Sequence, residues 1–256
     1  MIEIRTIEYS EAGTFLRLLC DVFGLDFDRA SSVFFADPLF DLERKWALFE
    51  SGQMVSILTT TGLTFGWGRA LGIAGVATLE EYRGRGYAEQ LLARALEASV
   101  ARGESGALLF AHRSDLYERL GFEVVDRVIR GPVARNSALL PMPEMPNRQV
   151  QAHYNRWAAL DPARLVRTPD RWRFWEWSFR LCEEAPGGYI CHEGPVVREA
   201  IRNPEPTWAG PLDFDWLGLE SLTQELCIPV VEAKEQMMLL SRACPLAPKM
   251  FMTDQF

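Results

Sequence analysis

Hydrophobic positions in the first half of the chain switch repeatedly between two spacings. Stretches in which apolar residues alternate or run together predict strands, and stretches in which they recur every three to four residues predict amphipathic helices. The expected strands span residues 2–7, 45–50, 54–61, 73–79, 108–111 and 122–129. The expected helices span residues 10–23, 28–35 and 114–120, with a longer one that ends at residue 102. Helices inserted between neighbouring strands predict an α/β fold with a mixed central sheet and flanking helices.

One segment, residues 71–102, joins a buried strand to a long helix through a turn rich in glycine and arginine. Glycines let the main chain turn freely and approach a ligand closely. Unpaired amides at the start of a helix favour an anion, and arginines add charge-assisted hydrogen bonds. The segment therefore predicts a phosphate site, and the alternative is a plain connection with two solvated arginines.

Three phosphate motifs compete for this turn. A P-loop requires a Gly-Lys pair followed by serine or threonine, and the chain contains no Gly-Lys pair. A dinucleotide fingerprint requires a third glycine where Glu89 stands, and its acidic residue should close the next strand, whereas Glu104 precedes that strand. The third motif is an acyl-CoA signature, which the residues below match.

Two short stretches resemble the signatures of the Gcn5-related N-acetyltransferase (GNAT) superfamily. The superfamily's acetyl-CoA signature is Arg/Gln-x-x-Gly-x-Gly/Ala directly after a central strand, and Arg83, Gly86 and Ala88 match its fixed positions. Residues 116–122 resemble the second signature, a tyrosine followed by Leu-Gly-Phe. The resemblance covers residues 1–135 and implies a catalytic domain of the acyl-CoA N-acyltransferase type.

The resemblance also implies roles for particular residues. It implies that Tyr117 is the catalytic acid that protonates the departing thiolate. The base stays open: Glu80 and Glu81 follow the central strand and could act through a water. The resemblance to tandem acetyltransferases, which place their C-terminus in the active site, adds the free carboxylate of Phe256 as a further candidate group. The GNAT resemblance implies acetyl-CoA as co-substrate, with main-chain amides of the central strand stabilising the oxyanion. The residues implied to bind acetyl-CoA are Val76, Ala77, Thr78, Arg83, Gly84, Arg85, Gly86, Tyr87 and Ala88.

The second half of the chain differs in composition. A proline-rich linker at residues 136–148 separates it from the first domain, and residues 149–256 predict a second, smaller α/β domain without a phosphate turn. This half looks like the degenerate second domain of tandem acetyltransferases, such as the enhanced-intracellular-survival group of aminoglycoside acetyltransferases. We expect its clustered tryptophans and arginines to pack in the core, with ligand stacking as the alternative.

The composition of the chain argues against several classes of partner. A net charge of −8 argues against a nucleic-acid surface. The sequence contains no run of 18 apolar residues, so it predicts no membrane span, and we expect a cytoplasmic protein. The five cysteines form no C-x-x-C pair, which predicts buried free thiols and no metal. The sequence leaves open whether the protein is a homo-oligomer.

These observations predict an acetyl-CoA-dependent N-acetyltransferase. Its acceptor is expected to be a primary amine of a small cationic metabolite, an antibiotic or a lysine. Acids interleaved with phenylalanines after the first strand favour a cationic amine, and an ordinary pair of amphipathic helices gives the same pattern: Asp21, Asp26, Asp28, Asp37 and Asp41 stand among Phe23, Phe27, Phe34, Phe35 and Phe40. The alternative is a non-catalytic acyl-CoA-binding module that regulates a partner.

Overall fold

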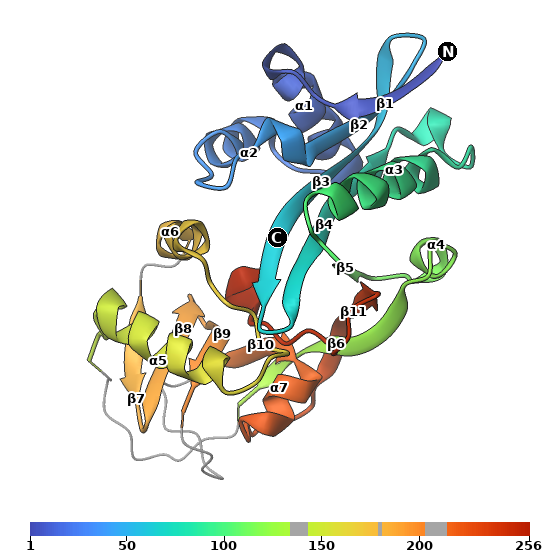
Figure 1. The fold of residues 1–256 in the computed structure, drawn as a ribbon. Coiled ribbons are helices and arrows are strands. Elements are labelled where there is room, and N and C mark those ends of the chain that lie inside the picture. The colour runs from blue at the N-terminus through green and yellow to red at the C-terminus, as the bar shows by residue number, and fades with distance from the viewer. Residues whose placement is uncertain (134–142, 179–180, 203–213) are drawn as a thin grey trace.

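The computed structural model describes residues 1–133, 143–178, 181–202 and 214–256, and it has the mixed α/β fold that the sequence predicts (Figure 1). The described strands form one sheet in the order β1-β2-β3-β4-β5-β11-β6-β10-β9-β8-β7. The strands are β1 (Ile2–Thr6), β2 (Lys45–Glu50), β3 (Gln53–Phe65), β4 (Gly68–Thr78), β5 (Gly106–Ala111), β6 (Glu123–Pro132), β7 (Cys182–Ala185), β8 (Gly188–Glu193), β9 (Val196–Ile201), β10 (Asp215–Leu219) and β11 (Lys234–Arg242). The α-helices are α1 (Ala12–Phe23), α2 (Phe27–Phe34), α3 (Tyr87–Ala101), α4 (Asp115–Glu118), α5 (Asn147–Ala159), α6 (Pro169–Ser178) and α7 (Glu220–Glu225).

The first hairpin forms where the sequence predicts it. Ser51 and Gly52 both have positive φ, 51° and 85°, as a two-residue hairpin turn of this twist requires. Beyond it, β3 and β4 are longer than expected and meet in a second hairpin after Phe65. The long β3–β4 hairpin reaches from the N-terminal half into the C-terminal half (Figure 1).

Two helices cover opposite faces of the N-terminal strands. Leu91, Leu92 and Ala95 of α3 pack against Leu71 and Ile73 of β4 in one cluster of buried residues. On the other face, a second cluster joins side chains of α1 to the neighbouring strands β3 and β4, including Phe15, Leu18, Ile57 and Ala77. Successive side chains of a strand point to opposite faces, so β4 contributes residues both to the cluster under α3 and to the cluster under α1.

The start of the first helix was predicted wrongly. Ser10 does not cap an α-helix, because it lies inside a short 3₁₀ turn, Tyr9–Glu11, and α1 begins only at Ala12. A capping box formed by Glu8 and Glu11 caps the 3₁₀ turn, and Glu11 Oε2 also pairs with Arg5 Nη1 at 2.7 Å. Residues 10 and 11 thus belong to the capped 3₁₀ turn and not to the α-helix.

The last strand of the chain lies in the middle of the sheet. β11 pairs antiparallel with β5 on one side and with β6 on the other, so a strand expected in the second domain completes the strands of the first. The sequence predicts strands at residues 188–191, 196–201 and 236–241, which form as β8, β9 and β11, whereas it does not predict β7 and β10. The division into domains 1–135 and 149–256 stays a prediction, and linker residues 136–142 lie outside the described residues. Residues 143–146 of that linker are described, and α5 already begins at Asn147.

The core of the C-terminal half is rich in aromatic rings. Trp157, Trp172 and Trp175 are buried in one cluster, which confirms that they pack in the core. The same cluster includes Leu63 and Phe65 of β3, because the β3–β4 hairpin inserts there. One hydrophobic core therefore joins the two halves of the chain.

A network of buried charges lies within this core. Arg167 donates to Asp254 Oδ1 and Oδ2 at 3.0 and 2.7 Å and to Glu199 Oε2 at 2.5 Å, and all three side chains are fully buried. Glu199 also accepts from Tyr189 and from Trp175 Nε1. The network fixes the segment around Asp254 to β9, since each charge in it has a partner.

Two further expectations concern the chain as a whole. Cys20, Cys182 and Cys191 are buried free thiols, as predicted, whereas Cys227 is exposed. Among the helices of the described ranges, none has the length and hydrophobicity to cross a membrane.

Candidate active site

The central strands β4 and β5 separate partway along their length. Residues 70–73 of β4 pair in parallel with residues 106–109 of β5. Beyond Ile73, β4 continues to pair with β3, whereas β5 continues to pair with β11. The main-chain edge of β4 that follows Ile73 is therefore turned toward a gap instead of a neighbouring strand.

A β-bulge lies in β4 at the start of this gap. Ile57 pairs with Ala77 and Thr59 with Ala74, so Gly75 and Val76 together face one residue of β3. Gly75 has φ 59°, which favours glycine, and a bulge of this kind takes one residue out of the ladder. Sequence reasoning missed Gly75, although a glycine inside a strand pattern is the signal for such a bulge.

A cavity of about 730 Å³ opens beside the bulge. We call it the β4–β5 cavity. Its wall combines β4 residues 73–76, the end of β5, helix α4 and the last residues of the chain. Phe110 and Phe256 lie in it with ring centroids 6.0 Å apart, and Tyr117 lines it as well. Val76 and Tyr117, both predicted from the sequence, thus lie in one cavity.

Tyr117 is held by packing. It lies on α4 and its ring meets that of Phe122 edge-on at 6.2 Å. Burial raises the pKa of the Tyr117 hydroxyl, because the phenolate would lose hydration. The hydroxyl therefore stays protonated throughout the neutral range, as a proton donor must.

The glycine turn that follows β4 is open. Gly84 and Gly86 have φ 75° and 74°, and a Cβ placed on either would meet nothing within 4 Å. Gly86 is the N-cap of α3 and has no side chain to satisfy the first amides of that helix. The turn therefore offers exposed main-chain donors next to the positive end of the α3 dipole.

The side chains around the turn divide into exposed and inward-facing ones. Arg83 donates through Nε to the carbonyl of Thr78 at 3.2 Å, and Arg85 pairs with Glu50 at 3.2 Å. Tyr87 points into the core, where its hydroxyl bonds to Glu50 Oε1 at 2.6 Å. Tyr87 therefore faces the turn through its main chain alone, while both arginines remain on the surface.

Inner contacts also hold the other predicted residues near the turn. Ala77 is buried against α1, and the Thr78 hydroxyl bonds to Ser56 Oγ at 2.8 Å. Ala88 lies in the first turn of α3. The bases named from the sequence, Glu80 and Glu81, are exposed in the 3₁₀ turn after β4 and are not among the residues that line the β4–β5 cavity.

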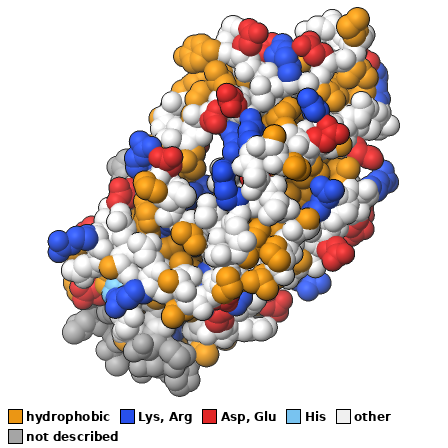
Figure 2. Space-filling model, viewed as in Figure 1, with side chains coloured by type: hydrophobic (Ala, Val, Ile, Leu, Met, Phe, Trp, Pro, Cys, Tyr) orange, Lys and Arg blue, Asp and Glu red, His pale blue; other side chains and the backbone are white. Residues whose placement is uncertain are grey.

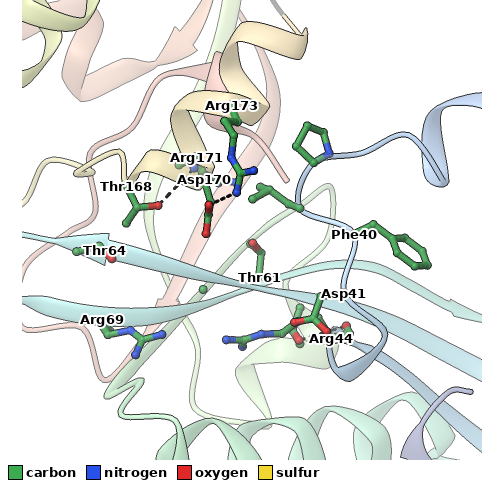
Figure 3. A pocket seen from close by; sticks show the side chains of 14 residues that line it. Phe40, Asp41, Arg44, Thr61, Thr64, Arg69, Thr168, Asp170, Arg171 and Arg173 are labelled. Carbon is green, nitrogen blue, oxygen red and sulfur yellow. Dashed lines mark hydrogen bonds and ion pairs between the residues drawn. The ribbon is translucent and has the colours of Figure 1, made fainter.

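A second cavity, of about 630 Å³, lies between β3, the segment before β2 and the start of α6 (Figure 3). We call it the arginine cavity. Guanidinium groups reach it from both sides, since Arg44 and Arg69 come from the sheet side and Arg171 and Arg173 from α6. Threonines 60, 61, 64 and 168 add hydroxyl groups. Figure 2 shows Lys and Arg side chains gathered in a hollow on this face.

The acids and aromatics expected around the acceptor divide between several places. Phe40 and Asp41 line the arginine cavity, and Phe23 lines the β4–β5 cavity. Asp26 and Asp41 accept from the main-chain amides of Arg29 and Glu43, as local caps do. These two acids thus have a structural role as well.

Residues 3–125 match the family model of the acetyltransferase (GNAT) domain. No curated protein matches the chain. A GCN5-related N-acetyltransferase from Kribbella flavida is similar in structure, with a TM-score of 0.72 at 19% identity, over 94% of this chain and 70% of that one. A GCN5-related N-acetyltransferase from Anabaena variabilis gives 0.65 at 16% identity, over 95% and 73%.

A third similar structure is Eis1 from Mycobacterium abscessus, with a TM-score of 0.62 at 17% identity, over 93% of this chain and 73% of that one. At these identities the structural matches establish the fold, and they extend over both halves of the chain. The family model therefore identifies residues 3–125 as a GNAT acetyltransferase domain, and the split between β4 and β5 lies within these residues.

Proposed function

We propose that this protein is an acetyl-CoA-dependent N-acetyltransferase that moves the acetyl group directly to a primary amine. The acceptor belongs to the small cationic metabolites, antibiotics or lysines. One observation carries the proposal: the open edge of β4 leads from the glycine turn to a cavity that contains Tyr117. A thioester bound along this edge has its diphosphate at the turn and its acyl carbon beside Tyr117.

The residues present fit such a co-substrate. Main-chain amides around Gly84 and Gly86 suit a diphosphate, since the turn is open and begins a helix. Arg83 and Arg85 add positive charge on the surface of the turn. The pantetheine arm can pair with the edge of β4 like an added strand, which uses the main-chain groups that β5 leaves unpaired.

The bulge supplies a donor for the reacting carbonyl. When the amine attacks the thioester, the carbonyl oxygen gains negative charge, and the amide of Val76 is the donor that we assign to it. A positioned donor of this type stabilises the transition state by about 3 kcal/mol. Because Gly75 adopts positive φ, the strand can present this amide without losing its register with β3.

Proton transfers accompany the acetyl transfer. An alkylammonium must lose a proton before it attacks, which costs about 4 to 5 kcal/mol at pH 7. His112 and Asp115 line the β4–β5 cavity and are able to accept that proton. Tyr117 gives its proton to the departing thiolate, which leaves as free coenzyme A, and the tyrosine is reprotonated by the second proton that the nitrogen loses as the amide forms.

Replacing Tyr117 with Phe should lower kcat by about 10²- to 10⁴-fold while the KM for acetyl-CoA stays close to that of the parent protein. The ring still packs on Phe122, so the loss reflects the hydroxyl alone. Steady-state rates of thiol release at saturating amine measure both constants.

Tyr9→Phe is the matched control, because this tyrosine is 73% exposed and lies outside both cavities. The pH profile gives a second test. Since burial raises the Tyr117 pKa, the rate should not fall through ionisation of this group below about pH 10. A Phe variant with the parent kcat would remove Tyr117 from the mechanism.

Acetyl-CoA should stabilise the folded protein. At a concentration 100-fold above Kd, binding adds about 2.7 kcal/mol to the free energy of unfolding, which a thermal shift detects. Desulfo-CoA, which lacks the thiol, serves as a control for recognition of the nucleotide and pantetheine without chemistry. No shift with either compound would contradict the proposed co-substrate.

The regulatory alternative predicts a different combination of results. A non-catalytic acyl-CoA-binding module would show the same thermal shift but release no thiol with any amine. We favour the enzyme because the β4–β5 cavity contains a half-buried tyrosine, whose pKa is raised by burial, next to an open strand edge. We further propose that residues 149–256 are a degenerate GNAT-like half, which contributes β11 and the cavity wall formed by Gln255 and Phe256.

A further inference from the structure

The arginine cavity presents an excess of hydrogen-bond donors. Its two carboxylates are both engaged, since Asp170 accepts from Arg173 and Asp41 from the amide of Glu43. Each guanidinium carries five N–H groups, and each threonine hydroxyl can donate as well. A ligand that fills this space favourably must therefore be rich in acceptors, as carboxylates and phosphates are.

Arg69 and Arg171 each have N–H groups without a close acceptor. Arg69 Nη1 donates to the carbonyl of Arg102 at 3.2 Å, and its nearest carboxylate oxygen, on Glu104, is 4.0 Å away. Arg171 Nη2 donates to the carbonyl of Asp254 at 2.8 Å, while its Nε is 3.8 Å from Asp254 Oδ1. Arg171 Nη1 has no hydrogen-bond partner among the described residues.

Burying the Arg171 guanidinium costs free energy unless a further anion pairs with it. Its side chain is buried on α6, and burial lowers its pKa even though Asp254 lies nearby. The carboxylate of Asp254 is already bound by Arg167, so it cannot fully compensate a second guanidinium. An anion in the cavity would reduce this cost, because a buried charge is stable only when it is paired.

The arginine cavity adjoins the β4–β5 cavity across a single glycine. Thr61 lines the first cavity and pairs with Gly72, and Phe256 lines the second. A Cβ on Gly72 would lie 2.8 Å from Thr61 Cγ2 and 2.9 Å from the Phe256 ring, so both side chains meet there. Gly75 lies three residues farther along β4, a rise of about 10 Å. A molecule that reaches both cavities must therefore pass Gly72 beside Thr61 and Phe256.

From these observations we propose that the acceptor is a primary amine that also bears an anionic group, a carboxylate or a phosphate. This inference rests on the proposed acetyltransferase function. The anionic group binds in the arginine cavity, with Arg69 and Arg171 as its donors. The amine extends past Phe256 toward the bulge at Gly75 and attacks the thioester there. The acceptor is then cationic at its reacting end and anionic at the other.

Four amines with the same carbon chain test the proposal: hexylamine, 6-aminohexanoate, 6-aminohexyl phosphate and 1,6-diaminohexane. We expect kcat/KM for one of the two anionic amines to exceed that for hexylamine by at least ten-fold, since a hydrogen bond to a charged group has about that effect. The better anionic amine identifies carboxylate or phosphate as the group recognised. A preference for the diamine, or equal rates with all four, would overturn the inference and leave acetyltransferase activity intact.

Variants connect the preference to the cavity. Arg69→Gln, and separately Arg173→Gln on the exposed side of the same cavity, should reduce the ratio of kcat/KM between the anionic amine and hexylamine toward one. Arg94→Gln is the matched control, because Arg94 forms an exposed ion pair with Glu97 on α3. A ratio that both cavity variants leave unchanged would contradict the proposal.

Direct binding separates failure of the inference from failure of the proposed function. Titration calorimetry with 6-aminohexanoate and 6-aminohexyl phosphate on the CoA-saturated protein needs no turnover. Tighter binding of either compound than of hexylamine, lost in Arg69→Gln, supports the anion site even if none of the four is acetylated. Equal or undetectable binding of all the amines to a protein that binds acetyl-CoA refutes the anion site alone. Absence of acetyl-CoA binding refutes the proposed function.

Discussion

Replacing Gly86 with Val should weaken acetyl-CoA binding by about 100-fold or more. The side chain would enter the open space over the turn, where a Cβ meets no atom within 4 Å, and would hold the diphosphate away from the amides. Losing two hydrogen bonds to a charged group accounts for a factor of this size. Titration calorimetry with acetyl-CoA measures it directly.

The substitution also strains the backbone, and a control at the other end of α3 isolates that effect. Gly103 has φ 73°, nearly the value of Gly86, and a Cβ there also meets nothing within 4 Å. Val in this region of φ costs about 1 to 2 kcal/mol at either position. Gly103→Val should therefore lose similar stability and keep its acetyl-CoA affinity. If both variants bind equally well, the diphosphate does not bind at this turn.

The second large effect concerns the buried charges of the C-terminal half. Arg167→Met should lower the free energy of unfolding by about 3 to 5 kcal/mol, because it leaves Glu199 and Asp254 buried without their cation. Urea denaturation followed by tryptophan fluorescence measures this change. Acetyl transfer should fall as well, since Asp254 anchors the segment that brings Phe256 into the β4–β5 cavity.

Two comparison variants test whether the stability lost in Arg167→Met comes from uncompensated buried charge. Arg94→Met removes an exposed ion pair and should change the stability by less than about 1 kcal/mol. Adding Glu199→Gln and Asp254→Asn to Arg167→Met removes the uncompensated charges, so part of the lost stability should return. A triple variant less stable than Arg167→Met would mean that the carboxylates contribute through packing rather than through their charge.

Local features of the fold could be predicted from the sequence. The hairpin at Ser51 and Gly52 depends on the conformational freedom of two adjacent residues, and α3 depends on the spacing of Leu91, Leu92 and Ala95. Both signals involve residues that are close together in the chain. The boundaries were less accurate, as at α1, where a 3₁₀ turn capped by Glu8 and Glu11 occupies the predicted start at Ser10.

Features that join distant residues were not predictable in the same way. The pairing of β11 with β5 and β6 depends on contacts more than a hundred residues apart. The arginine cavity combines Arg44 and Arg69 with Arg171, and no local spacing connects them. In contrast, Gly75 carried a usable signal, because an isolated glycine inside a strand pattern indicates a bulge.

The central position of β11 has a consequence for how the protein is made. β6 ends at Pro132 and β11 ends at Arg242, so the ribosome must add about 110 residues after β6 before the neighbouring strand exists. At a translation rate of about 5 to 20 residues per second, the edges of β5 and β6 that later pair with β11 stay unpaired for roughly 5 to 20 seconds. During synthesis the nascent N-terminal half is therefore a natural client for chaperones, and a premature stop codon before Lys234 would release an aggregation-prone fragment.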